Sequence, residues 1–176
     1  MASAAETAAT WVAVPCVVFV AQKISPVPLE AFGIVPRTLW GLVGVACGPL
    51  LHANLGHLLA NIAPLFVLLC LLFWDRKYKP VPTLVQIWLW SGLGTWLIGR
   101  GDAVHLGASS VIYGLVTYLI VAGVLLRRWR SAFVSVLVVV LYGGIFYGVL
   151  PRHGPISWEG HLCGALAGMW AAYRIR

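Results

Sequence analysis

The sequence predicts an all-α membrane protein with six membrane-spanning helices, and three observations support this prediction. Of its 176 residues, 61% are apolar and only 10% are charged, whereas soluble domains are about half apolar and about one quarter charged. Apolar segments long enough to cross a bilayer recur along the chain. Lys and Arg gather in short clusters between them. We therefore expect one membrane domain over residues 1–176, with lipid as its solvent.

The predicted spans follow one another with a single long interruption. A spanning helix needs about 20 mainly apolar residues, or somewhat fewer where the protein thins the bilayer. Pro15 interrupts the first span, and the absence of a positively charged segment before that span indicates a retained helix rather than a cleaved signal peptide. The six spans are predicted at about residues 8–22, 57–74, 82–99, 109–126, 131–150 and 160–175.

Residues 23–56 form the long connection between the first two spans. This connection is rich in proline and includes an apolar stretch from Leu39 to Leu51. Because that stretch is too short to span, we interpret it as a re-entrant or interfacial segment. The expected fold is a six-helix bundle with a long, partly membrane-embedded connection between its first two helices.

The net charge of +7 is explained by loop charges rather than by a surface for nucleic acid. One basic cluster lies within residues 76–79 and another within 127–130, in the turns after the second and fourth spans. Cytoplasmic loops carry such clusters, so both turns, and with six spans both termini, are predicted to lie in the cytoplasm. The outer loops retain only Lys23, Arg37, Arg100 and Arg152.

Five polar side chains fall at the outer end of the predicted bundle, where ionisable and amide groups are costly and usually functional. They are His52, His57, Asn61, Ser109 and His161. His57 and Asn61 are four residues apart and share one helix face, where both are candidate donors to a single oxygen. The common depth of all five predicts a functional site that opens toward the outer side.

Ser109 and His161 together form the minimum for nucleophilic acyl transfer, in which an imidazole takes the hydroxyl proton and later gives it to the leaving amine. Gly164 and Gly168 follow His161 at helical spacing, and such small-residue stripes let two helix backbones approach closely. Gly107 permits a tight approach before Ser109. A position at a helix start also leaves the backbone N–H groups near Ser109 free to bind an oxyanion.

These residues also have purely structural interpretations. A serine at a helix start is most often an N-cap. His57 with Asn61 is typical of interhelical hydrogen bonding that only stabilises a bundle. Tyr113 alone would be an ordinary core aromatic residue. The remaining histidines, His105 and His153, are interpreted as solvated loop residues.

Two other classes of function are disfavoured by the sequence. A zinc site would use three histidines at similar depth, but the five-residue step from His52 to His57 differs from the four-residue step of HExxH, and the four cysteines show no CxxC pairing. A transporter or channel with proton-carrying histidines predicts internal repeats or broken, charged helices near the midplane. The predicted midplane is apolar. We therefore expect neither a metal nor another cofactor.

Three segments together resemble the motifs of the rhomboid family. Residues 52–61, with His52, His57 and Asn61, resemble its second-helix motif. Residues 107–110 resemble its G-x-S-x nucleophile motif, and residues 160–168 resemble its final-helix motif. The three occur in the family's order, on the second, fourth and sixth spans. The resemblance covers roughly residues 10–176 and is to the small six-helix prokaryotic type.

The resemblance implies an intramembrane serine endopeptidase, with Ser109 as nucleophile and His161 as general base and acid. It implies an oxyanion site made by the Ser109 N–H, His57 and Asn61. It also implies that Tyr113 packs against the His161 ring, in the orienting role that an Asp has in soluble triads. The residues expected to support the site are His52, Gly107, Tyr113, Gly164 and Gly168.

The resemblance also implies partners and a location. Substrates would be single-pass transmembrane proteins, cut near the outer end of their helix in a bacterial plasma membrane. Their access route would be surrounded by the long first connection and by a mobile fifth span with its loop at residues 151–158. Membrane lipid is the other expected partner and nucleic acid is not, while the sequence carries no signal for an oligomeric state.

Two positions depart from the family pattern. The residue after the nucleophile is usually Gly and here is Ser110, whose side chain must fit where helices pack closely. Residues 36–40 of the first connection replace the adjacent Trp-Arg pair found in many members. Ser110 motivates an alternative function, that of a catalytically weak or inactive rhomboid-like protein that binds transmembrane helices without cutting them.

Overall fold

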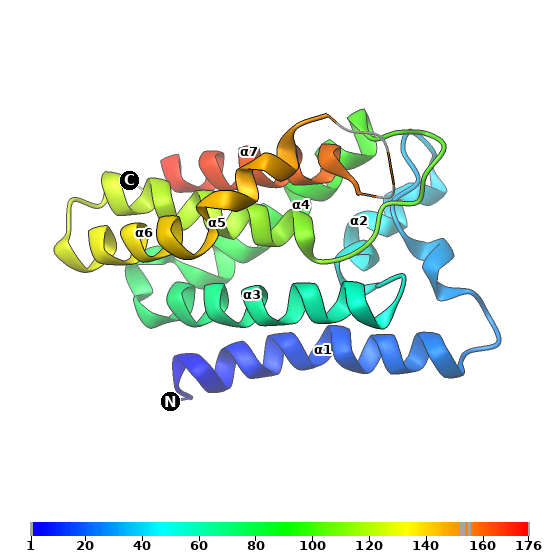
Figure 1. Cartoon of the computed structure of the whole chain (residues 1–176), viewed down its shortest axis with the longest axis horizontal. Helices are drawn as coiled ribbons and strands as arrows, with labels where there is room; N and C mark the ends of the chain where they lie inside the picture. The colour runs from blue at the N-terminus through cyan, green and yellow to red at the C-terminus, as the bar shows by residue number, and fades with distance from the viewer. Residues whose placement is uncertain (1, 152–153, 155, 176) are drawn as a thin grey trace.

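The computed structural model of the protein is a bundle of helices that run in alternating directions (Figure 1). It describes residues 2–151, 154 and 156–175, and within these residues it contains no β-strand, which confirms the all-α prediction. The α-helices are α1 (Ala4–Ile24), α2 (Val43–Cys47), α3 (Leu55–Trp74), α4 (Pro80–Ile98), α5 (Ser109–Leu125), α6 (Trp129–Tyr142) and α7 (Trp158–Tyr173). Shorter 3-10 segments are η1 (Leu29–Phe32), η2 (Trp40–Leu42), η3 (Gly48–Leu50), η4 (Arg76–Tyr78) and η5 (Gly143–Val149).

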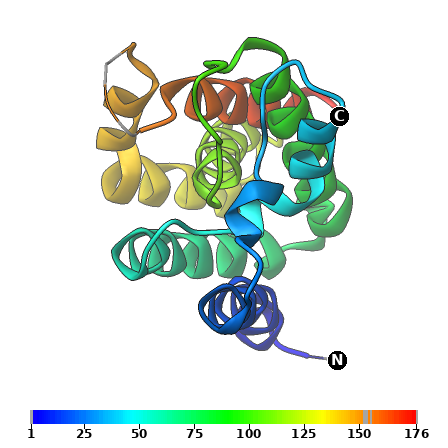
Figure 2. The ribbon, with the colours of Figure 1, turned by 90° about the vertical axis from the view of Figure 1, so that its right-hand side faces the viewer.

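Helix α5 lies at the centre of the bundle. Seen from one end, α3, α4, α6 and α7 surround it, while α1 lies at the periphery against α3 (Figure 2). Successive side chains of α5 are buried, and Leu115, Val116, Tyr118 and Leu119 are each 0% exposed. A helix that is apolar on all sides suits this position, because its neighbours are other helices. Ser109, the first residue of α5, is therefore held among several helices.

The contact between α5 and α7 depends on two glycines of α7. A Cβ atom at Gly164 would overlap the backbone carbonyl of Ser110, and one at Gly168 would overlap that of Gly114. Only hydrogen at both positions lets the two backbones meet. The glycine stripe thus sets the distance between the helices that carry Ser109 and His161.

Among the described residues, four helical segments are long and apolar enough to cross a membrane, namely Ala4–Ile24, Leu55–Trp74, Arg76–Ile98 and Trp129–Val149. Helix α5 is a shorter apolar helix of 17 residues, and α7 has 16. Large apolar side chains such as Val17, Val124 and Val140 are exposed on the outer surface, as expected where lipid is the neighbour. These features are those of an integral membrane protein. That it has six spans stays a prediction.

The span predicted at residues 131–150 is divided in the structure. Helix α6 ends at Tyr142, and the chain continues as the 3-10 segment η5. Gly143 and Gly144 stand at this junction. Consecutive glycines lower the stability of a continuing α-helix and favour the break. The break directs η5 toward α7, with which it is in contact.

Both termini lie at the same end of the bundle as the α3–α4 and α5–α6 turns (Figure 1). Arg128 and Asp75 join the two turns through an ion pair with an N–O distance of 2.7 Å. The charge clusters predicted to face the cytoplasm are therefore gathered at one end, while α5 and α7 begin at the other (Figure 1). The cytoplasmic assignment stays a prediction, and Arg152 and His153 lie outside the described residues.

Candidate active site

Ser109 and His161 come from different helices and meet where both helices begin. Ser109 is the first residue of α5, and His161 lies in the first turn of α7. The Nε2 atom of His161 lies 3.1 Å from the Oγ atom of Ser109, which is within hydrogen-bond range. His161 is only 8% exposed, so little water competes for the pair. This geometry allows the imidazole to take the hydroxyl proton.

The other ring nitrogen of His161 faces a backbone carbonyl. Its Nδ1 atom lies 3.0 Å from the carbonyl oxygen of Gly148 in η5. Because a carbonyl only accepts, Nδ1 carries the proton, which leaves the Nε2 lone pair directed at Ser109. The Tyr113 ring stacks on the imidazole, with centroids 4.0 Å apart and planes 9° apart. A carbonyl and an aromatic ring thus hold His161, as a carboxylate does in soluble triads.

Gly107 shapes the chain just before the serine. Its φ angle is 104°, in the left-handed region that favours glycine. A Cβ atom there would lie 2.6 Å from the His57 ring. The Gly107 N–H donates to the carbonyl of Gly48 at 2.9 Å, which ties this turn to the long first connection. Any other residue at position 107 would strain the backbone and displace His57.

Candidate oxyanion donors border the same cavity as the Ser–His pair. The cavity has a volume of about 440 Å³, and its lining includes His57, Asn61, Ser109, Tyr113 and His161. Asn61 is 4% exposed, and one N–H of its amide donates to the carbonyl of His57 at 2.7 Å. The amide nitrogen carries a second hydrogen. That hydrogen, the His57 ring and the backbone N–H groups at the start of α5 are the candidate donors to a substrate oxygen.

His52 does not line this cavity but supports His57. The two rings meet edge to face, with centroids 5.1 Å apart. His52 is 0% exposed, and burial, together with the adjacent His57, lowers the pKa of His52 to about 4. The Gln22 side chain of α1 accepts from the His52 N–H at 3.1 Å and donates to its carbonyl at 3.2 Å. His52 is therefore a neutral packing group, held in place by a residue that the sequence did not single out.

A partly buried ion pair fixes the chain that leads into α7. The Nε atom of Arg100 lies 2.9 Å from a carboxylate oxygen of Glu159, whose side chain is 2% exposed. The guanidinium also donates to the carbonyls of Gly154 and Ile156 at 3.0 and 2.8 Å. Ile156 and Ser157 line the cavity that holds the Ser–His pair. Arg100 therefore holds one wall of that cavity in position.

His105 lies in the loop between α4 and α5, as predicted, but the interpretation that it is solvated is wrong. His105 is 5% exposed, and burial lowers its pKa. Its backbone exchanges two hydrogen bonds with Ile34, at 2.8 and 2.9 Å. Its Nδ1 atom lies 2.6 Å from the Oγ of Ser157, the hydroxyl that caps α7 by accepting from the Gly160 N–H. These partners could not be recognised from the sequence because they lie far from His105 along the chain.

Ser110 fits beside the nucleophile with its hydroxyl near α4. The hydroxyl of Ser91 in α4 donates to the Oγ of Ser110 at 3.5 Å. The part of Ser110 that contacts Gly164 is its backbone carbonyl. A hydroxymethyl group in place of the usual glycine hydrogen therefore leaves the close contact between α5 and α7 unchanged.

Comparison with known proteins identifies the family of this chain. The family model of the rhomboid domain matches residues 36–176. Uncharacterized proteins of Mycobacterium tuberculosis and Mycobacterium bovis are each 41% identical over 96% of this chain and 74% of their own length. One of Mycobacterium leprae is 39% identical over 78% of this chain and 56% of its own length. No solved structure matches.

The chain belongs to the rhomboid family, a family of membrane proteins that are generally intramembrane serine proteases. The match begins after α1 and covers every residue of the Ser–His pair, the glycine stripe and the candidate oxyanion donors.

Proposed function

We propose that the protein is an intramembrane serine endopeptidase that cuts transmembrane segments with a Ser109–His161 dyad. In this proposal α1 and α3 to α7 form six spans, and both termini lie in the cytoplasm of a bacterial cell. The observation that carries the proposal is the double hydrogen bonding of His161, whose Nε2 lies 3.1 Å from Ser109 Oγ while Nδ1 lies 3.0 Å from the Gly148 carbonyl. That arrangement supplies a general base with its lone pair on the nucleophile.

The reaction would proceed in two stages. The Ser109 hydroxyl attacks the substrate carbonyl carbon while its proton passes to His161 Nε2, and the resulting oxyanion takes hydrogen bonds from the Ser109 N–H, Asn61 and His57. The imidazolium then protonates the leaving amine as the C–N bond breaks, which leaves an acyl ester on Ser109. In the second stage His161 takes a proton from water, the hydroxide displaces the ester, and Ser109 recovers its proton.

An opening toward the bilayer would admit the substrate. A cavity of about 510 Å³ lies between α3 and the junction of α6 with η5, and Pro64 and Ile145 line both this cavity and the one at the dyad. The two cavities are therefore adjacent. This continuity supports lateral access of a single-pass transmembrane segment between α3 and η5, so that its outer end meets Ser109.

The alternative function, helix binding without cleavage, was motivated by Ser110. Its Oγ lies 3.5 Å from the Oγ of Ser91 in α4. The dyad distance of 3.1 Å supports proton transfer from Ser109 to His161. The proteolytic proposal is therefore better supported than the alternative.

Cleavage of a transmembrane segment tests the proposal. Wild-type protein in liposomes is expected to cut a single-pass segment that carries helix-breaking residues near its outer end, and Ser109→Ala is expected to leave that segment intact. Ser110→Gly is the matched control, because it removes the neighbouring hydroxyl and only the weak contact with Ser91. This control is expected to keep most of the activity. If Ser109→Ala still cuts the segment, another residue must be the nucleophile.

Asn61→Ala is expected to lower kcat by about 10²–10³ while KM stays nearly constant, because an oxyanion donor acts on charge that forms in the transition state. Asn54→Ala is the control, since Asn54 is the other amide that lines the cavity and caps α3 by accepting from the His57 N–H. Loss of that cap should cost about 1 kcal/mol of stability with little change in kcat. An unchanged kcat in Asn61→Ala would assign Asn61 to helix packing.

A further inference from the structure

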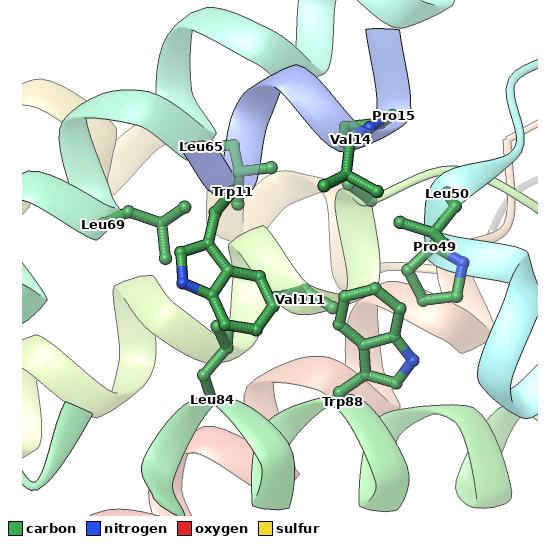
Figure 3. A pocket seen from close by; sticks show the side chains of 11 residues that line it. Trp11, Val14, Pro15, Pro49, Leu50, Leu65, Leu69, Leu84, Trp88 and Val111 are labelled. Carbon is green, nitrogen blue, oxygen red and sulfur yellow. The ribbon is translucent and has the colours of Figure 1, made fainter. Parts of the chain in front are cut away.

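A third cavity, separate from the one at the dyad, lies beside the first turn of α5 (Figure 3). It has a volume of about 150 Å³ and is bounded by α1, α3, α4, α5 and η3. The indoles of Trp11 and Trp88 lie on either side of Val111 in this view. The two cavities share no lining residue: Ala108 and Val111 border this one, while Ser109 and Ile112 border the other.

The lining of this third cavity is apolar throughout. Aliphatic side chains and prolines make up most of it, and its polar atoms are confined to the two tryptophans and the backbone. The indole N–H of Trp88 is already bound, because it donates to the carbonyl of Val45 at 3.0 Å. A cavity of this size without polar partners does not retain water, and apolar cavities of about 150 Å³ take up guests of the size of benzene. The ligand chemistry that fits is therefore hydrocarbon.

The position of the cavity indicates the source of that hydrocarbon. Helix α1 packs mainly against α3 and η3, and side chains of both α1 and α4 line the cavity. Val14, on the α1 side, is 42% exposed. In an integral membrane protein an exposed apolar side chain borders lipid tails. The α1 edge of the cavity therefore borders the lipid-facing surface.

We propose that the end of a lipid acyl chain inserts between α1 and α4 and occupies this cavity. The bound chain contacts Leu84 of α4 and Val111 of α5, which are 3% and 2% exposed and cannot meet lipid that stays on the outer surface. Because Val111 lies one helical turn from Ala108, the occupant packs directly behind the segment that carries Ser109. Binding at this site does not depend on the proposed catalytic function.

Photolabelling of the intact protein tests this proposal. The wild type is placed in liposomes of phosphatidylcholine in which a fraction of the lipid carries a diazirine at the end of one acyl chain, and labelled residues are mapped by mass spectrometry after illumination. Label is expected on Leu84 or Val111, as well as on Val140, which is 75% exposed and serves as the control for surface lipid. Label on Val140 without label on Leu84, Val111 or the neighbouring Leu69 would overturn the proposal.

Two variants that fill the cavity provide a second measurement. Leu84→Trp and Leu69→Trp place an indole in the space from α4 and from α3, and each is expected to reduce the interior labelling at least tenfold while the Val140 label stays constant. The two substitutions lie on different helices. If thermal unfolding shows that one variant is misfolded, the labelling of the other variant tests the proposal. Interior labelling that persists in a folded variant would show that the label arises elsewhere than in this cavity.

Discussion

Gly164→Ala is expected to lower the activity of the protein by at least 10²-fold and to lower its thermal stability. The added Cβ would overlap the backbone carbonyl of Ser110, and neither backbone has room to yield without separating α7 from α5. Overpacking of this kind costs about 1–3 kcal/mol. Separation of the helices also moves His161 away from Ser109, and a misplacement of about 1 Å in a catalytic pair costs about 10²-fold in rate.

The measurements for Gly164→Ala are the rate of cleavage of a transmembrane segment and the midpoint of thermal unfolding in detergent. Gly56→Ala is the matched control, because an added Cβ in this helical glycine of α3 meets only the Asn54 side chain, at 3.4 Å. This control should retain both activity and stability. Wild-type behaviour of Gly164→Ala would contradict the direct backbone contact between α5 and α7.

Gly148→Ala is expected to produce a comparable loss of activity with a smaller loss of stability. A Cβ at position 148 would overlap the Tyr113 hydroxyl and lie 3.2 Å from His161 Nδ1. Either η5 or the stacked pair of rings must move, and both movements remove the acceptor that keeps the proton on Nδ1. Without that acceptor the ring is free to adopt the tautomer that cannot accept from Ser109, and loss of the correct tautomer in a soluble triad costs about 10⁴ in kcat.

Gly144→Ala is the control for Gly148→Ala, because it lies in the same segment and an added Cβ there meets nothing within 4 Å. We expect kcat to fall in Gly148→Ala with KM nearly unchanged, since the change acts on the dyad rather than on substrate binding. A rise in KM at constant kcat would instead assign Gly148 to the access route. Equal kcat values for the two variants would show that the Gly148 carbonyl does not orient His161.

The sequence predicted those parts of the site that depend on side-chain identity at fixed spacing. Ser109, His161 and the Gly164/Gly168 stripe could be placed together because helical periodicity aligns them and because hydrogen is the only group that permits a backbone contact. Gly107 was identified for a tight approach, and its positive φ and its contact with His57 give the physical reason. Their roles in catalysis stay predictions.

Other parts of the site could not be predicted from the sequence, for two reasons. The acceptor for His161 Nδ1 is a backbone carbonyl, and every residue has one, so no residue type marks Gly148. The partners of Arg100, at Gly154, Ile156 and Glu159, lie more than 50 residues away and meet it only after α4 and α7 are packed. The division of α6 from η5 also depends on tertiary contacts, because the run of apolar residues continues across Gly143 and Gly144.

Labelling of Ser109 by a fluorophosphonate probe in detergent-solubilised protein tests the pairing of Ser109 with His161 directly. The probe forms a covalent bond only with a serine whose hydroxyl is activated by a base, so labelling reports the dyad without a substrate. We expect wild type and Ser110→Gly to be labelled on Ser109, and Ser109→Ala and His161→Ala to remain unlabelled while keeping the thermal unfolding midpoint of a folded protein. Absence of labelling in the folded wild type, or labelling of His161→Ala at the wild-type rate, would contradict the assignment of Ser109 and His161 as a catalytic pair.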